Sequence, residues 1–148
     1  MIFRRSTRAN VVRGAAYVAL SLALQAAVGC GSSSEEGPAI ETVTVSGALG
    51  ALTCTATPEA VLAQGMNAFS LLLSDKATGA PVDGASIEVT TWMPSMSHYT
   101  EGEQVMPMGE GAYHIESVSL VMAGDWEVVY AITSGSLNDT CTFEYPIP

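Results

Sequence analysis

The residues best suited to chemistry lie in two short segments, 91–99 and 104–111. Four of the seven methionines fall between residues 93 and 108, and His98 lies among them. Thioether sulfurs and an imidazole form a soft donor set that prefers Cu(I) to hard ions. The clustering therefore predicts a Cu(I) site made of Met93, Met96 and His98, completed by Met106 or Met108.

The local sequence also favours convergence of these donors. In extended backbone, side chains two residues apart share a face, so each segment presents its paired donors on one side. Pro94 and Pro107 put both segments at sheet edges or in loops. The Glu101–Gly102 turn between the segments predicts a hairpin that brings them together.

A second interpretation needs no metal. Methionine is a flexible filler of protein cores and packs well against aromatic rings. The same four methionines then plug one end of the domain near Trp92 and Tyr99, and the chain is an interaction or structural module. His114, the other candidate imidazole, stands between Tyr113 and Ile115 and is expected to point away from their face.

Catalytic motifs are missing from the sequence. It contains two histidines, no G-x-S-x-G element and no glycine-rich phosphate loop. The nearby carboxylates, Glu101, Glu103 and Glu110, are expected in exposed turns, where no acid–base pair is assembled. We therefore expect no enzymatic activity.

The N-terminus has the pattern of an export signal. Four arginines lie within residues 1–13, and a mostly apolar run follows over 14–28. This run is shorter than the roughly 20 residues that span a bilayer, which favours a signal peptide.

The end of that signal resembles the lipobox of bacterial lipoproteins, with Cys30 as the acylated residue after Ala27-Val28-Gly29. We predict a signal peptide over 1–29, a lipidated Cys30 and flexible tether over 30–50, and a folded domain over 51–148. Because Gly31 follows the cysteine where an aspartate would favour the inner membrane, the resemblance implies an outer-membrane anchor facing the periplasm or the cell surface. The alternative is an ordinary secretory signal with an incidental Cys30.

With Cys30 acylated, the remaining cysteines are an even pair, Cys54 and Cys141. Outside the cytoplasm such a pair is most simply a disulfide. The bridge would tie the first strand of the domain to the last and contribute roughly 4 to 5 kcal/mol in the chain-entropy model.

Charge excludes one class of partner. The 148-residue chain has a net charge of −10, from five basic and fifteen acidic residues. Removal of the four N-terminal arginines leaves Lys76 against all the carboxylates, or 1 − 15 = −14. Phosphate backbones and anionic lipids would repel such a polyanion, so we expect no nucleic-acid binding and membrane attachment through the lipid anchor alone.

Alternation of apolar and polar residues dominates the chain beyond residue 50. The runs cover 52–57, 68–73, 86–91, 112–120, 126–132 and 140–145, with turn clusters between them, and a short β-like stretch precedes them at 42–45. Apart from the signal peptide, no window shows a helical apolar stripe. The pattern predicts an all-β fold, an immunoglobulin-like antiparallel β-sandwich of about seven strands.

The order of four motifs resembles the YtkA-like domain family. They are G-A-P-V-D-G-A at 79–85, M-P-S-M-S-H at 93–98, G-A-Y at 111–113 and G-D-W at 124–126. The resemblance covers roughly residues 52–133. It implies a small extracytoplasmic sandwich, often on a lipoprotein, with an envelope protein or metal-efflux component as partner and no established activity.

Overall fold

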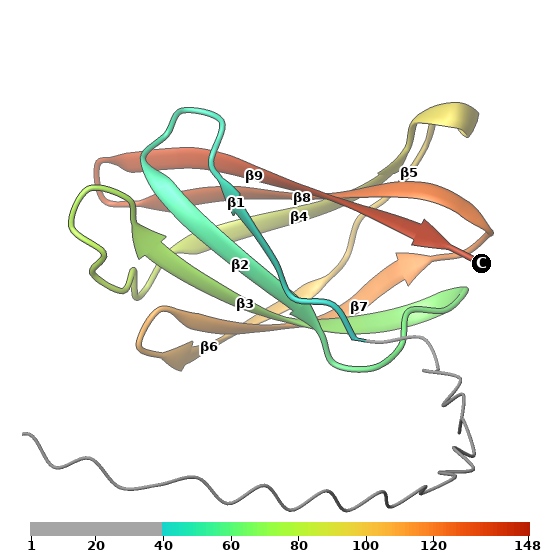
Figure 1. Ribbon diagram of the computed structural model, residues 1–148, viewed down its shortest axis with the longest axis horizontal. Coiled ribbons are helices and arrows are strands. Elements are labelled where there is room, and N and C mark those ends of the chain that lie inside the picture. Colours follow the sequence, from blue (N-terminus) through green and yellow to red (C-terminus); the bar gives the residue numbers. More distant parts are fainter. Residues whose placement is uncertain (1–39) are drawn as a thin grey trace, which may run out of the picture. The chain divides into compact units, whose positions relative to one another are not determined.

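The computed structural model describes residues 40–148 (Figure 1). The predicted signal peptide, Cys30 and the tether as far as residue 39 lie outside the described residues. Among residues 40–148, no helix is long and apolar enough to cross a membrane.

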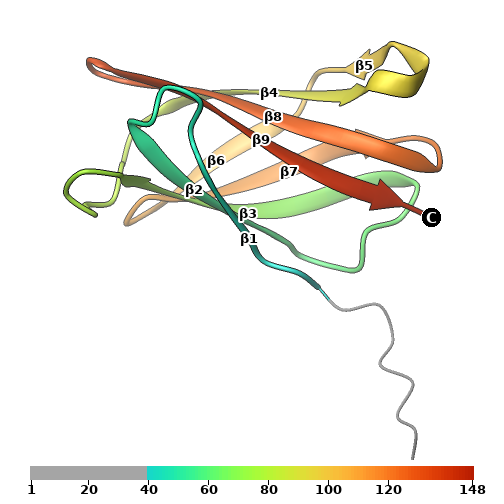
Figure 2. The same ribbon diagram turned by 45° about the horizontal axis from the view of Figure 1, so that its top comes forward.

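Nine strands and one short 3₁₀ turn make up the described part of the chain. In chain order they are β1 (Val43–Ser46), β2 (Leu52–Pro58), β3 (Gly65–Asp75), β4 (Ser86–Met93), η1 (Pro94–Met96), β5 (His98–Thr100), β6 (Gln104–Gly109), β7 (Ala112–Leu120), β8 (Gly124–Ser134) and β9 (Leu137–Ile147). They form two antiparallel sheets, β1-β2-β3-β7-β6 and β5-β4-β8-β9, which face each other (Figures 1 and 2).

The strand order is that of an immunoglobulin-like sandwich. The sets β2-β3-β7-β6 and β5-β4-β8-β9 reproduce the A-B-E-D and C′-C-F-G orders of that fold. The predicted fold class is therefore confirmed, with nine strands in place of about seven. One additional strand, β1, lies beside β2 and pairs Val45 with Cys54.

The N-terminal boundary of the domain needs a correction. The flexible tether predicted over 30–50 includes residues 43–46, but these residues form β1 and hydrogen-bond to β2. Val43 and Val45 alternate with exposed residues and pack half-buried against the core, which is the physical reason for the pairing. The folded domain therefore begins before residue 51.

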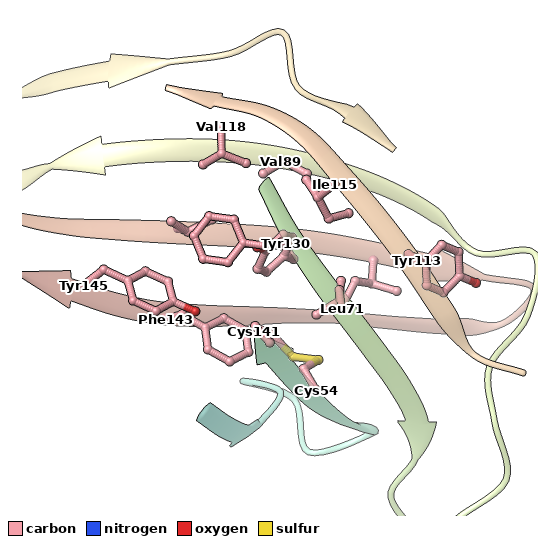
Figure 3. Packing of buried hydrophobic residues seen from close by; sticks show 14 of the residues in the cluster. Cys54, Leu71, Val89, Tyr113, Ile115, Val118, Tyr130, Cys141, Phe143 and Tyr145 are labelled. Carbon is pink, nitrogen blue, oxygen red and sulfur yellow. A yellow bond between two sulfur atoms is a disulfide. The ribbon is translucent and has the colours of Figure 1, made fainter. Parts of the chain in front are cut away.

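The core fills the space between the sheets and follows the predicted alternation. Its largest fully buried side chains include Trp126 and Tyr130 on β8, Tyr113 on β7, Phe69 on β3 and Phe143 on β9. Figure 3 shows the aromatic rings of β8 and β9 between the two layers. Because all nine strands and this core lie within residues 40–148, the sandwich has the components of an independent folding unit.

Two links tie the β1–β2 region to β9 on the facing sheet. Cys54 and Cys141 form the predicted disulfide (Figure 3). Because β1 precedes it, Cys54 lies on the second strand of the domain and not on the first as predicted. Close by, the buried Asp139 carboxylate accepts hydrogen bonds from the backbone N–H groups of Leu49, Ala51 and Leu52 at 2.7, 2.8 and 3.0 Å.

Candidate metal site at the β4–β5 hairpin

The segment Met93–His98 forms a tight hairpin at one end of the sandwich. Strand β4 ends at Met93, η1 makes the turn, and β5 begins at His98. Ser97 closes η1 in the left-handed conformation, with φ 50°. Met93 and His98 are direct partners in the β4–β5 register. Side chains of such partners leave the same face of a sheet, with Cβ atoms about 5 Å apart.

Met93 belongs to the core. Its side chain is 1% exposed and lies over Gly124 at the start of β8. A Cβ atom on Gly124 would stand 2.8 Å from the Met93 methyl carbon, so the glycine makes room for the thioether. The thioether of Met93 is therefore buried next to the start of β8.

His98 packs beside Met93 against an indole ring. The imidazole is half-buried and lies edge-on to Trp126, with 6.0 Å between ring centroids. The Trp126 indole is fully buried, and its Nε1–H donates a 2.9 Å hydrogen bond to the Met122 carbonyl. His98 therefore packs against an indole ring that burial and a hydrogen bond hold in position.

Met96 is the exposed donor of this hairpin. It is the last residue of η1, and 64% of its surface is exposed. The hairpin therefore carries three predicted donors at three depths: Met93 in the core, His98 half-buried and Met96 in solvent.

The predicted hairpin between the two methionine segments is wrong. β5 pairs with β4 in one sheet, whereas β6 pairs with β7 in the other. Residues 101–103 carry the chain across from one sheet to the other, and β6 runs on toward the opposite end of the sandwich from η1 (Figure 2). The reversal occurs instead at 94–97, within the first segment.

Met106 and Met108 therefore lie apart from the hairpin. They point outward from β6 and are 39% and 69% exposed. Val105, which precedes both of them on β6, packs toward the core. The predicted donor set is split into Met93, Met96 and His98 on one sheet and Met106 and Met108 on the other.

Two threonine hydroxyls lie together where the chain leaves β5 and crosses to the other sheet. Thr91 on β4 and Thr100 on β5 are cross-strand partners whose hydroxyls contact each other. Both hydroxyls also lie near the Ser119 carbonyl of β7, at 3.4 and 3.3 Å, and the hydroxyl that does not donate to its partner can donate to that carbonyl. This polar contact joins the β4–β5 pair to β7 of the facing sheet.

Glu103, expected in an exposed turn, is partly inside the sandwich. Both of its carboxylate oxygens are buried, and neither has a hydrogen-bond partner among the described residues. Burial raises the pKa of this carboxyl; the backbone N–H groups of Glu103 and Gly102, which lie near it without completing a hydrogen bond, partly oppose that effect, and the Glu101 charge adds a smaller increase. The alternation of apolar and polar residues could not predict the burial of Glu103, because this residue lies in the segment that connects β5 to β6.

His114 points outward, as predicted, and its two ring nitrogens face two carboxylates. Nδ1 lies 2.6 Å from Glu59 Oε1, and Nε2 lies 3.0 Å from Glu116 Oε1. Hydrogen bonds to Glu116 and then to Glu59 raise the pKa of the imidazole, against a smaller opposing effect of burial. Over residues 40–148, no three His, Cys, Asp or Glu side chains converge on one point as metal ligands.

Carboxylates line a cleft beside η1. The cleft has a volume of about 500 Å³ and lies between Pro94–Ser95 and the outer face of β8 and β9. Its walls include Asp125, Glu127 and Glu144, and the last two are direct cross-strand partners. Like charges in that position repel each other, so the cleft concentrates negative potential next to the hairpin.

Fold and motif order together define the class of protein. The YtkA-like family model matches residues 49–131. The chain belongs to the YtkA-like family, as the four motifs predict. Comparison with curated proteins gives no match.

Two solved structures of the FetP protein from a uropathogenic Escherichia coli strain are similar to the chain. One is a copper-bound variant, and the other is the protein as isolated after expression in the periplasm. Both are 12% identical, cover 74% of this chain and have a TM-score of 0.47; the alignments cover 95% and 94% of the FetP chains.

Proposed function

We propose that the protein is a lipid-anchored YtkA-like module outside the cytoplasm that binds Cu(I) at the β4–β5 hairpin and has no enzymatic activity. Cys30 carries the acyl chains in this proposal, and the outer membrane is the membrane concerned. The activity is reversible coordination of Cu(I) and its transfer to an envelope protein such as a metal-efflux component.

The observation that carries the proposal is the pairing of Met93 with His98 beneath an exposed Met96. A thioether and an imidazole that leave the same face at about 5 Å separation can approach one ion through rotation of the flexible methionine side chain. Met96 lies in the turn that joins them, where an incoming ion or partner has access. Because the site uses sulfur and nitrogen donors, Cu(I) is the ion that it fits.

The compartment is supported by the disulfide. Cys54–Cys141 is a buried bridge between the two sheets, and such bridges persist in oxidising compartments. The charge of the chain beyond the arginines also agrees with attachment by acyl chains, because an acidic surface gains nothing from anionic lipids.

The test is a Cu(I) titration of the soluble fragment 31–148 against a chromophoric competitor. The fragment contains the whole sandwich and lacks Cys30. We compare it with a Met93→Leu/Met96→Leu/His98→Asn variant and with a matched Met106→Leu/Met108→Leu variant from β6. Loss of binding in the first variant alone supports the site. Equal binding in all three proteins, or binding in none, overturns it.

A second candidate function is a non-enzymatic interaction or structural module without metal. Burial of Met93 in the core and exposure of Met108 on the edge strand β6 favour it, since the first is accounted for by packing and the second by a contact surface. The same titration separates the two functions, because this module binds no Cu(I) in any of the three proteins.

A further inference from the structure

A histidine held between two carboxylates lies on the outer face of the other sheet, apart from the β4–β5 hairpin. His114 on β7 contacts Glu59, just after β2, through Nδ1 and contacts Glu116 of its own strand through Nε2. The Glu59 N–H donates to the Ala68 carbonyl of β3, so a backbone bond holds the end of β2 in place beside His114.

An irregularity in β7 lies at the same point. The register between β3 and β7 shifts between Asn67 and Phe69, where β7 contains one residue more than β3. Ser117, next to Glu116, takes up this irregularity with φ 64°, a conformation that residues other than glycine rarely adopt. Bulges of this kind re-aim neighbouring side chains and are over-represented next to functional sites.

His114, Glu59 and Glu116 cannot all be ligands of the same metal ion. Nδ1 and Nε2 lie on opposite sides of the imidazole, so Glu59 and Glu116 cannot both bind an ion that is bound to one nitrogen. With Glu59 holding the Nδ1–H, Nε2 becomes the ligand, which is the carboxylate–histidine arrangement of many metal sites. The Glu116 oxygen lies beside that ligand nitrogen at 3.0 Å.

That separation fits two ligands of one ion. Nitrogen and oxygen ligands at about 2.1 Å from a metal, at a right angle, are about 3 Å apart. The Glu116 side chain is 48% exposed, so it is free to rotate and open space for the ion. On the neighbouring edge strand, Met106 is the direct partner of His114 and also points outward, which adds a thioether on the open side.

We propose that His114 Nε2 and Glu116 bind a divalent transition-metal ion, with Cu²⁺ preferred over Zn²⁺, while Glu59 orients the imidazole and Met106 offers a weak additional ligand. Nitrogen and oxygen donors bind Cu²⁺ most tightly among the first-row divalent ions. The site is distinct from the Cu(I) hairpin in its residues, its sheet and its preferred oxidation state.

Binding at this site exchanges a proton for the ion. In the metal-free protein, both ring nitrogens donate to carboxylates only if the imidazole is protonated. The ion replaces the Nε2 proton, which passes to solvent, and the Nδ1–H···Glu59 contact is kept. Around the ring, β3 presents Ser70 and β6 presents Met106, neither of which titrates, so the two glutamates are the charged groups that set this exchange.

The test is a Cu²⁺ titration of fragment 31–148 with an acetylated amino terminus, followed by electron paramagnetic resonance. We expect nitrogen hyperfine coupling, release of one proton per ion below the imidazole pKa, and affinity that rises about tenfold per pH unit there. Glu59→Gln should weaken binding roughly ten- to hundredfold without changing the number of nitrogen ligands. Zn²⁺ should bind more weakly than Cu²⁺.

The variants make the outcome decisive. His114→Gln should remove the nitrogen coupling, whereas His98→Asn and Met108→Leu should bind Cu²⁺ at this site as the parent fragment does. Circular dichroism of the metal-free proteins checks that each variant is folded. The proposal is overturned by parent-like affinity in His114→Gln, or by no binding, or by binding without proton release in the parent fragment.

Discussion

Asp139 on β9 and Gly47 in the turn between β1 and β2 are in direct contact, so closely that a methyl group on Gly47 would overlap the Asp139 carboxylate. The carboxylate accepts from four backbone N–H groups, three in the β1–β2 turn region and one on Thr140. This contact joins the two sheets near the disulfide.

Gly47→Ala should therefore destabilise the domain. Gly47 does not have a positive φ, so the substitution tests the overlap and not the strain of a left-handed backbone. We expect a loss of about 1–3 kcal/mol in the free energy of unfolding, as for other overpacked sites. Urea unfolding measures it, with exposed Ser46→Ala as the matched control. Equal stability of both variants would contradict the contact.

Asp139→Asn should cost about 1–3 kcal/mol, because the amide cannot serve all four N–H donors. Burial raises the pKa of Asp139, but the N–H groups of Leu49, Leu52, Thr140 and Ala51 more than offset it, so the pKa lies below 3.8. The folded state thus gains stability above pH 3.8 and loses it as the pH falls through the lowered pKa. Unfolding curves from pH 7 to pH 2 should show this loss in the parent and less of it in Asp139→Asn.

Much of the fold could be predicted from alternation. Runs such as Trp126–Ile132 have one apolar face, and a two-layer sandwich is what buries such faces. The disulfide followed from cysteine number and compartment. The alternation at 42–45 indicates a short strand, but it does not show that this strand joins the domain, because its two apolar side chains are buried only by pairing with the free edge of β2.

The site could be predicted only in part. Local turn chemistry marked Glu101–Gly102 as a reversal, but the chain reverses at Pro94–Ser97 and then changes sheets, a choice made by pairing partners distant in sequence. His114 was placed outward correctly because its neighbours on β7 are core residues. Its partner Glu59 is 55 positions away, and no local pattern indicates that contact.

Glu103→Gln should stabilise the domain at neutral pH. Its carboxyl ionises near pH 4.5 in the unfolded chain but at higher pH when folded, because burial penalises the charge. Stability therefore declines as the pH rises from 4.5 through the raised pKa and stays lower above it. Thermal unfolding of Glu103→Gln should lack this decline, whereas Glu101→Gln, at an exposed position, should keep it. Parallel curves for Glu103→Gln and the parent would rule out the buried carboxylate.

His114 should titrate above 6.5, since Glu116 and Glu59 favour the protonated ring. Stability from these contacts is fully present below pH 6.5 and is lost as the pH rises through the raised pKa. Proton NMR of the imidazole measures the pKa directly, with His98→Asn used to assign the two rings. Glu59→Gln and Glu116→Gln should each lower the pKa of His114, and an unchanged value in both would argue against the two contacts.

Truncation of Met93 should destabilise the domain, whereas truncation of Met96 should leave the free energy of unfolding almost unchanged. Met93→Ala removes a buried side chain that touches Gly124 and should cost about 2–5 kcal/mol. Met96→Ala removes an exposed side chain and should change stability by less than about 0.5 kcal/mol. Gly124→Ala should resemble Met93→Ala in direction, because its Cβ would meet the Met93 methyl group at 2.8 Å and its φ of 135° disfavours a side chain. Since the proposed Cu(I) site includes both methionines, added Cu(I) should raise the melting temperature of the parent and raise it less in Met96→Ala, although the metal-free stabilities of these two proteins match. An equal rise in both would show that Met96 does not bind the ion.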